Sequence, residues 1–380
     1  MTNGNFNEIQ SQTIDWLRLP LTVLIFFIHM NPQNDTNYIV MSDIVWKDGL
    51  NLKEIYSVLG TLISTFSGIA VPSFFMFSGY LFFYKFNEWK TDLYLNKIRK
   101  RIKTLFVPYV IWNSLLILSS LSIVIIKRES ALAYLSNLWN TGILHLFWDS
   151  KILNENATNI LGWSLKKWAP HNIPLWFLRD LIMVCLLSPL LFAGLKYLKK
   201  YFLVLLGICF LLNAWTTIPG FSITSLFFFS LGAYFGIYNK NMIKAFSKHK
   251  YIYWIIASIA LILSVILKGS TLAKVTSQLY TFTGVLSVFV LSSALIQKQI
   301  VKVNTTLSRS SFFLYCLHTI LILSISQYIL NKILGTENMV SVIFSYLLSP
   351  LLCTIICLGA FLLLRKRAPS LLNILAGSRK

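Results

Sequence analysis

The chain has 380 residues, of which 56% are hydrophobic and only 12% are charged. Soluble domains are about 45–50% apolar and about 25% charged, so this composition excludes an ordinary soluble enzyme and a disordered chain. The net charge of +21 would suggest nucleic-acid binding in a soluble protein. Because cytoplasmic loops of membrane proteins also collect Lys and Arg, we expect no nucleic-acid partner.

Apolar runs follow one another along the chain with the length of membrane-spanning helices. A helix needs about 20 such residues to cross a bilayer, and irregular backbone facing lipid is not tolerated there. The sequence therefore predicts an all-α, polytopic integral membrane protein with about ten transmembrane helices, in a single domain over residues 1–380. The runs fall at about 14–31, 56–84, 104–126, 174–195, 201–217, 220–238, 251–268, 276–297, 310–330 and 339–364.

The distribution of charge predicts the orientation of these helices. When the N-terminus is placed in the cytoplasm, the inside loops and the tail hold more than twice as many Lys and Arg residues as the outside loops. The positive-inside rule then places both termini in the cytoplasm of a multi-pass protein in the cell (inner) membrane. The polar N-terminus lacks the features of a signal peptide, so we expect the first run to stay as a membrane helix.

Two ionisable residues of the first run, Arg18 and His29, are eleven positions apart. On an α-helix this is roughly 16 Å and about three turns, so both side chains point to nearly the same face. Each has a structural explanation: Arg18 can reach the lipid headgroups, and His29 can bond a neighbouring helix. Because such groups are costly at membrane depth, the pair also predicts a site. There the cation would hold an anionic donor and the imidazole would take a proton from a hydroxyl nucleophile.

Later runs carry further polar groups. Ser78 lies within residues 71–80, whose proline and glycine allow a kink and close helix packing. Arg179 and Asp180 are adjacent, so we expect them not to face each other on a helix and each to need a partner elsewhere. His318 is a second histidine in an apolar helix, where a structural histidine is as good an explanation as a site.

The basic run 97–103 precedes a Pro-Tyr pair and is predicted to face the cytoplasm. It certainly acts as an orientation signal. Its arginines, Arg99 and Arg101, also suit a phosphate clamp for a nucleotide-like donor, because the guanidinium fork matches phosphate geometry.

The longest connection, about 127–173, is predicted to face outward and is rich in tryptophan. An aromatic belt at the membrane interface explains these residues, and a sugar-facing lid is the alternative. They are Trp139, Trp148, Trp163 and Trp168, with His145 and His171 beside them.

No metal site or nucleotide-binding motif is predicted. The five cysteines lie in apolar runs without zinc spacing, and no phosphate-binding glycine loop or dinucleotide fingerprint appears in a credible context.

Five sequence elements, in order along the predicted spans, resemble the membrane acyltransferase-3 family, whose members O-acylate sugars of bacterial envelope polysaccharides. The likeness covers about residues 12–365 and is most specific in an Arg-X10-His pattern. The matching residues are Arg18 and His29; Phe74, Phe75, Ser78, Gly79 and Tyr80; Arg99, Arg101, Pro108 and Tyr109; Leu175, Trp176 and Phe177; and Ser308, Phe312, Tyr315 and His318. The chain is similar to the stand-alone form, without the soluble esterase-like domain that members often add.

The resemblance implies an acyl-CoA donor, most simply acetyl-CoA as a co-substrate with no bound cofactor, and an envelope glycan acceptor. It implies a catalytic role for His29, as a general base or as a transient acyl carrier, and a donor-binding or organising role for Arg18. Ser78, Arg179 and His318 are then candidates to stabilise the oxyanion, with Asp180 beside them in a supporting polar site.

The sequence thus predicts an integral membrane O-acyltransferase acting on a cell-surface or lipid-linked glycan. The alternatives are a transporter or flippase for a lipid-linked sugar without acyl transfer, a scaffold or sensor in envelope assembly, and an enzyme that transfers another acyl group, for example succinyl.

Overall fold

A computed structural model describes the chain except for residues 1–2, 31, 45–48, 85, 87, 153–157, 161–162, 166–167, 216–217 and 379–380. It confirms the all-α fold class. The first half contains α1 (Asn3–His29), α2 (Leu52–Ser67), α3 (Ala70–Phe83), α4 (Thr91–Arg101), α5 (Val107–Ile126), α6 (Ala131–Thr141), α7 (Ile143–Trp148), α8 (Trp176–Leu186) and α9 (Ser188–Leu198). The second half contains α10 (Lys200–Leu211), α11 (Ile223–Ile237), α12 (Met242–Ser247), α13 (Lys250–Ile266), α14 (Thr271–Gln297), α15 (Thr305–Leu317), α16 (Leu323–Leu334), α17 (Met339–Arg367) and α18 (Pro369–Leu375).

Shorter elements connect these helices. Three are 3-10 turns: η1 (Pro32–Asn34), η2 (Met41–Asp43) and η4 (Ile173–Leu175). Two are π turns, which join α4 to α5 and α15 to α16: η3 (Ile102–Phe106) and η5 (His318–Ile322).

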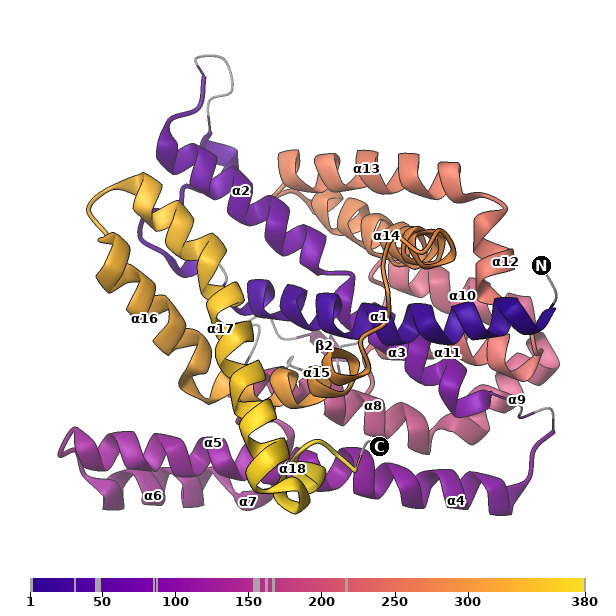
Figure 1. Cartoon of the computed structure of the whole chain (residues 1–380), viewed down its shortest axis with the longest axis horizontal. Coiled ribbons are helices and arrows are strands. Elements are labelled where there is room, and N and C mark those ends of the chain that lie inside the picture. The colour runs from indigo at the N-terminus through magenta and orange to yellow at the C-terminus, as the bar shows by residue number, and fades with distance from the viewer. Residues whose placement is uncertain are drawn as a thin grey trace.

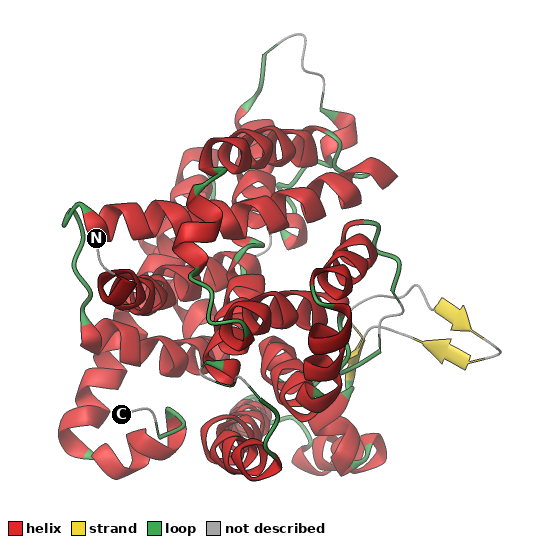
Figure 2. Cartoon of the chain, turned by 90° about the vertical axis from the view of Figure 1, so that its right-hand side faces the viewer, coloured by secondary structure: helices red, strands yellow, loops and turns green. Residues whose placement is uncertain are grey.

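The predicted outward stretch 127–173 contains more structure than a loop. Besides α6 and α7 it holds two antiparallel strand pairs, at one side of the helical body (Figure 2). The pairs are β1 (Lys151–Ile152) with β4 (Trp168–Ala169), and β2 (Thr158–Ile160) with β3 (Trp163–Leu165).

Apolar helices occupy all ten predicted runs. By length and composition, six helices among the described residues can cross a membrane. A seventh is gained if the pair Ile173–Leu186 and Ser188–Leu198, bent by 61°, counts as one span. The remaining runs form the shorter helices Lys200–Leu211, Ile223–Ile237 and Lys250–Ile266. The chain is therefore a multi-pass membrane protein, while the count of ten crossings and the cytoplasmic termini stay predictions.

Several helices begin where a side chain can accept bonds from the free N–H groups of the first turn. Asn51 caps α2 in a reciprocal box with Glu54, the arrangement that satisfies two orphan donors at once. Other helices begin at one Ser or Asn whose side chain accepts a hydrogen bond from the first turn, without the reciprocal bond, and this residue fixes where the helix starts. Such caps include Ser222 of α11, Ser270 of α14, Asn304 of α15 and Asn338 of α17.

Helix α1 runs through the middle of the molecule, and α2, α3, α14, α15 and α17 all contact it (Figure 1). Because α1 carries both Arg18 and His29, the helices that pack on it surround the region between these two residues.

Helices α3 and α11 touch backbone to backbone. A Cβ atom at Gly79 of α3 would collide with the carbonyl of Phe229, and one at Gly232 of α11 would collide with the carbonyl of Met76. Gly236, one turn after Gly232, faces α3 in the same way. This small-xxx-small spacing lets two membrane helices approach closely, where packing replaces the hydrophobic effect as the driving force.

We predict that Gly232→Ala destabilises the folded protein by about 1–3 kcal/mol, the usual cost of overpacking. The matched control is Gly359→Ala, which adds the same methyl group to α17, where it meets open space. Thermal unfolding of the purified protein in detergent measures both. Equal unfolding midpoints for the two variants would contradict a backbone contact between α3 and α11.

Candidate functional site

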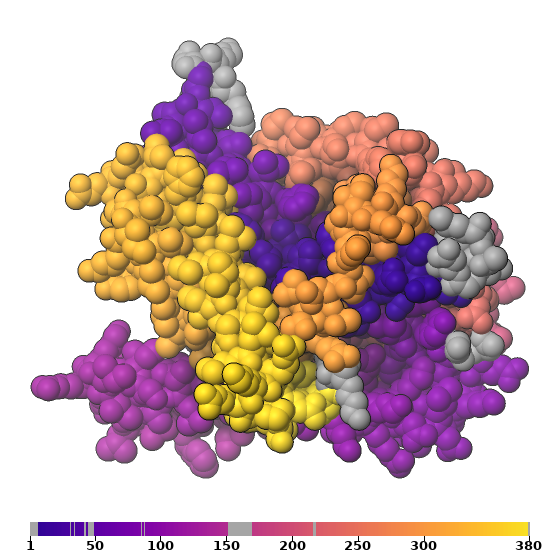
Figure 3. All heavy atoms as spheres, in the orientation of Figure 1, coloured from indigo at the N-terminus to yellow at the C-terminus, as the bar shows by residue number. Residues whose placement is uncertain are grey.

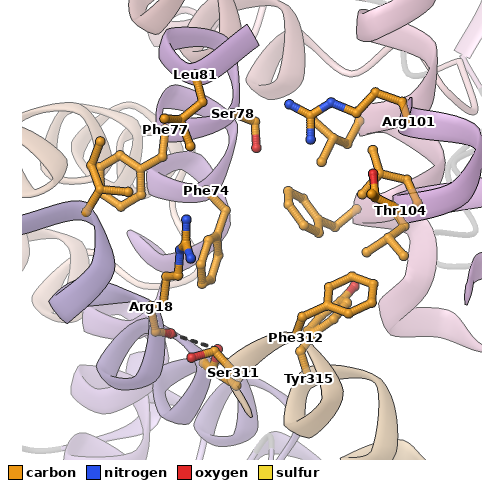
Figure 4. Close-up of a pocket in the computed structure, with 16 residues that line it drawn as sticks. Arg18, Phe74, Phe77, Ser78, Leu81, Arg101, Thr104, Ser311, Phe312 and Tyr315 are labelled. Atoms are coloured by element: carbon orange, nitrogen blue, oxygen red, sulfur yellow. Dashed lines mark hydrogen bonds between the residues drawn. The ribbon is translucent and has the colours of Figure 1, made fainter. Parts of the chain in front are cut away.

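A central pocket of about 350 Å³ lies between α1, α3, α8, α15 and the junction of α4 with η3. Two arginines that the sequence predicts to belong to a site line it from different sides, Arg18 from α1 and Arg101 from the end of α4. Figure 4 shows both guanidinium groups, and the Ser78 hydroxyl, directed into the same space. The rest of the lining is mainly apolar, including Phe74, Phe77, Leu81, Leu105, Phe177, Leu178, Leu181, Phe312 and Tyr315. Two cations in apolar surroundings are suited to a ligand with an anionic end.

Arg18 is held by its own helix. Its Nη1 lies 3.1 Å from Oδ1 of Asp15, one turn earlier, and 30% of its side chain is exposed. A single i, i+3 carboxylate leaves other guanidinium N–H groups to face the pocket. The prediction that Arg18 belongs to a site is therefore compatible with its position, and snorkelling is not needed to explain it.

The position of Arg101 follows from the ring faces of α3. The Cζ atom of Arg101 lies 5.8 Å from the Phe82 ring centroid. One turn earlier, the Lys97 ammonium donates to the Phe82 carbonyl and lies 4.9 Å from the Phe86 ring centroid. Cations attract the negative faces of aromatic rings, so these contacts fix α4 against α3 and aim Arg101 at the pocket.

The π turn after Arg101 has a chemical cause. Pro108 has no N–H and cannot complete the regular ladder to the preceding turn, and the Val107 N–H bonds Ile102 instead. The widened turn contains Thr104 and Leu105, which line the pocket. Gly377 covers its outer side so closely that a Cβ there would meet the Thr104 carbonyl.

Arg99 lies away from the central pocket. It is exposed on α4 and is not among the lining residues. The predicted donor-binding role of Arg99 stays a prediction, whereas that of Arg101 has a pocket beside it.

His29 and His318 lie together at the far end of α1. Their ring centroids are 5.3 Å apart, although the residues are far apart in sequence. His318 is fully buried and stacks on Phe26 with centroids 4.5 Å apart, while His29 is half-buried. Tyr315 lines the pocket and its ring centroid is 6.1 Å from that of His318. An aromatic path thus leads from the pocket to the histidine pair.

The hydrogen bonding of His318 fixes how its ring is used. Nδ1 lies 2.6 Å from the carbonyl oxygen of Tyr315, and the N–H donates there because a carbonyl can only accept. In the neutral ring the lone pair is then on Nε2. That atom is buried and has no hydrogen-bond partner among the described residues. A buried polar atom left in this state is a candidate for use by a ligand or a water.

The backbone directly after His318 is strained. Within η5, Leu321 has φ +66° and Ile320 has ψ +67°, and neither is glycine. Such conformations persist only where the surroundings hold them, and π turns are often found at functional sites. The adjacent Thr319 hydroxyl donates to Oδ1 of Asn172, 3.1 Å away, and the Asn172 N–H donates to Oδ1 of Asn113. This buried network ties η5 to α5 and holds His318 in place.

The prediction that Arg179 and Asp180 do not face each other was wrong, whereas the prediction that each has a partner elsewhere is confirmed. Nε and Nη2 of Arg179 both donate to Oδ1 of Asp180, at 3.1 and 2.9 Å. The guanidinium is long enough to fold back beside the neighbouring carboxylate, which the helix-face argument ignores. Nη1 also donates to the Trp148 carbonyl at 2.6 Å, and Asp180 accepts from the N–H of Gly220 at 3.2 Å.

This buried ion pair therefore links α8 to α7 and to the turn before α11. Arg179 and Asp180 are 4% and 1% exposed and do not line the central pocket. Their predicted part in a supporting polar site remains untested, and their contacts explain them as a structural brace.

The tryptophans of the stretch 127–173 have different surroundings. Trp139 is exposed on α6. The guanidinium of Arg179 lies over the Trp148 ring, with its Cζ atom 5.4 Å from the ring centroid. His145 bonds Asp149 at 2.5 Å. The side chains of Trp163 and Trp168 lie outside the described residues. The lid hypothesis stays a prediction.

Sequence reasoning missed the residues that join the two parts of the site. Asn172 and Thr319 were not singled out, because a single polar residue beside or within an apolar run carries no pattern. Thr104 was missed because the widened turn exposes a side chain that a regular helix would not. Among the described residues, no group of three His, Cys, Asp or Glu side chains could hold a metal ion.

Comparisons with known proteins bear on this arrangement. The model of a family described as "Acyltransferase domain" matches residues 11–359. The chain belongs to the membrane acyltransferase-3 family. It is therefore a membrane acyltransferase, and the matched residues include the pocket arginines and both histidines.

One curated relative is the succinoglycan biosynthesis protein ExoH of Rhizobium meliloti (strain 1021). It is 25% identical over 327 residues, which is 82% of this chain and 79% of the relative. No solved structure shows a significant match to the chain.

We predict that Arg101→Gln raises the KM for an anionic acyl donor by about tenfold, because it removes a charge-assisted bond from the pocket. Lys100→Gln is the matched control, since Lys100 is exposed on the same turn and does not line the pocket. Initial rates in proteoliposomes at varied donor concentration measure both. Equal KM values for the two variants would contradict donor binding between Arg18 and Arg101.

Proposed function

We propose that this protein is an integral membrane O-acyltransferase that moves an acetyl group from acetyl-CoA to a hydroxyl of a cell-surface or lipid-linked glycan. Membership of an acyltransferase family supports the reaction class. The name of the relative from Rhizobium meliloti, a succinoglycan biosynthesis protein, supports a polysaccharide acceptor. We place the enzyme in the cell (inner) membrane, where a cytoplasmic donor and an outward glycan can both reach the bundle.

One observation carries the proposal. Two arginines meet in a pocket beside the middle of α1, and a histidine pair lies at the C-terminal end of α1. Tyr315 lines the pocket, and its ring lies 6.1 Å from that of His318. The eleven residues from Arg18 to His29 span roughly 16 Å of helix. This separation suits a donor with phosphates at one end and a thioester at the end of a long flexible arm.

His29 is then the general base. It takes the proton of the acceptor hydroxyl while the oxygen attacks the thioester carbonyl. The tetrahedral oxyanion collapses, the carbon–sulfur bond breaks, and the leaving thiolate takes up the proton. The products are an O-acyl glycan and free CoA, and no further reactant is needed. We assign the orientation of His29 and the stabilisation of charge to His318, whose ring centroid is 5.3 Å from that of His29. Ser78 faces the arginine pocket and would contact the donor there.

We predict that His29→Ala lowers kcat by about 10²–10⁴-fold, the usual contribution of a positioned base. The measurement is mass spectrometry of envelope glycans from a deletion strain complemented with wild type or with the variant at equal membrane level. We expect a mass step of one acetyl group with wild type and its loss with the variant.

The same spectra separate the alternatives. A step of another acyl mass, such as succinyl, would keep the enzyme and change the donor. Unchanged acylation in the variant would overturn the role of His29. A fall in surface glycan with no acyl difference would instead indicate a transporter. A labelled acyl group stably attached to the wild-type protein but absent from His29→Ala would assign His29 as an acyl carrier.

We predict that His318→Asn lowers kcat by about 10²-fold while the donor KM stays within about twofold. The asparagine amide can still donate to the Tyr315 carbonyl but has no counterpart of Nε2, and the arginines are untouched. Steady-state kinetics in proteoliposomes give the two parameters. A large rise in KM, or wild-type kcat, would show that the Nε2 atom is not used in the chemistry.

A further inference from the structure

A second pocket of about 410 Å³ lies apart from the site already described, between α15, α17 and α18. Arg309 of α15 and Arg365 of α17 line it, together with Ser370 and Asn373 of α18. No acidic residue is among the described residues that line it. In Figure 3, α17 and α18 are yellow and lie on the surface beside the orange α15. The Arg309–Arg365 pocket is thus cationic and open to the surface.

Packing holds the walls of this pocket in place. Nη1 of Arg365 donates to Oγ1 of Thr306 at 3.0 Å, which joins the end of α17 to the first turn of α15. Helix α18 is anchored on its other side, because Nε1 of Trp112 donates to the Leu375 carbonyl at 3.0 Å and Leu372 is buried. A site whose walls are fixed before binding loses little entropy when it binds.

The pocket lies where a membrane helix leaves the hydrocarbon. Helix α17 has 29 residues, so it is about 44 Å long and exceeds the roughly 30 Å hydrocarbon layer. Its last turn is basic, and Arg365 belongs to it. Exposed apolar side chains of α18 adjoin pocket-lining residues in sequence: Leu371 follows Ser370 and Ile374 follows Asn373, and each of the two is 48% exposed. Cations at headgroup level therefore adjoin an apolar surface.

We propose that the Arg309–Arg365 pocket binds the phosphate of an anionic membrane lipid. Guanidinium forks bind phosphate oxygens in pairs, and the Ser370 hydroxyl and the Asn373 amide add neutral donors. The acyl chains of the lipid would lie on the exposed Leu371 and Ile374, an apolar contact that a free phosphate ion does not make. Basic pockets between membrane helices bind acidic lipid headgroups in other proteins.

The test compares the double variant Arg309→Gln/Arg365→Gln with the control Lys366→Gln/Arg367→Gln. The control removes the same charge from the same end of α17 but leaves the pocket lining intact. Full-length protein in detergent is titrated with phosphatidylglycerol, phosphatidylcholine, inorganic phosphate or coenzyme A, and binding is followed by native mass spectrometry and by the unfolding midpoint.

We expect phosphatidylglycerol to bind and stabilise the wild type and the control, and to bind the pocket variant at least about tenfold more weakly. The proposal is overturned if both double variants lose binding equally, if phosphatidylcholine binds as well, or if inorganic phosphate gives the same stabilisation. Coenzyme A, whose proposed site lies between Arg18 and Arg101, is expected to stabilise the wild type and the pocket variant equally. A selective loss of that stabilisation in the pocket variant would also overturn the assignment to a lipid. If the double variant unfolds without lipid, the single variant Arg309→Gln is used in its place, because it keeps the bond from Arg365 to Thr306.

Discussion

The close contact between α3 and α11 is the constraint on which the rest of the structure depends. Hydrocarbon surrounds membrane helices on all sides, so burying apolar surface does not by itself bring two of them together. Here the absence of side chains at Gly79, Gly232 and Gly236 lets the two backbones meet. The other side of α3 then lies against α1 and α8, and it supplies Ser78 and much of the apolar pocket lining. Phe82 of α3 also contacts Arg101 of α4.

The central helix α1 divides the chemistry into two parts. Its middle carries Arg18 beside a mainly apolar pocket, and its C-terminal end carries His29 beside the buried His318. Keeping the two apart has a physical advantage, since a fixed positive charge next to the base would favour the neutral ring and weaken it as a proton acceptor. The brace formed by Arg179 and Asp180 stabilises the wall of α8 without adding charge to either part.

The sequence predicted what depends on composition and local pattern: the helical class and the places of the apolar helices. The alignment of Arg18 with His29 on one face of α1 stays a prediction. The break after Arg101 was not predicted, although Pro108 is a local cause of it. The break after His318 could not be predicted, because no proline or glycine lies within η5 and tertiary packing holds the strained residues there. The meeting of His29 with His318 was hidden for the same reason: it depends on how α15 crosses α1, which no single run of sequence records.

The π turn after His318 has a consequence for how this region can change. A regular helix rotates each residue by about 100°, so the direction of one side chain dictates those of its neighbours. The wider turn absorbs an extra residue and separates the two halves of the span. Residues on the outer surface of α16 can therefore be substituted, or α16 can tilt when the bilayer thickness changes, while the His318 imidazole before it keeps its orientation.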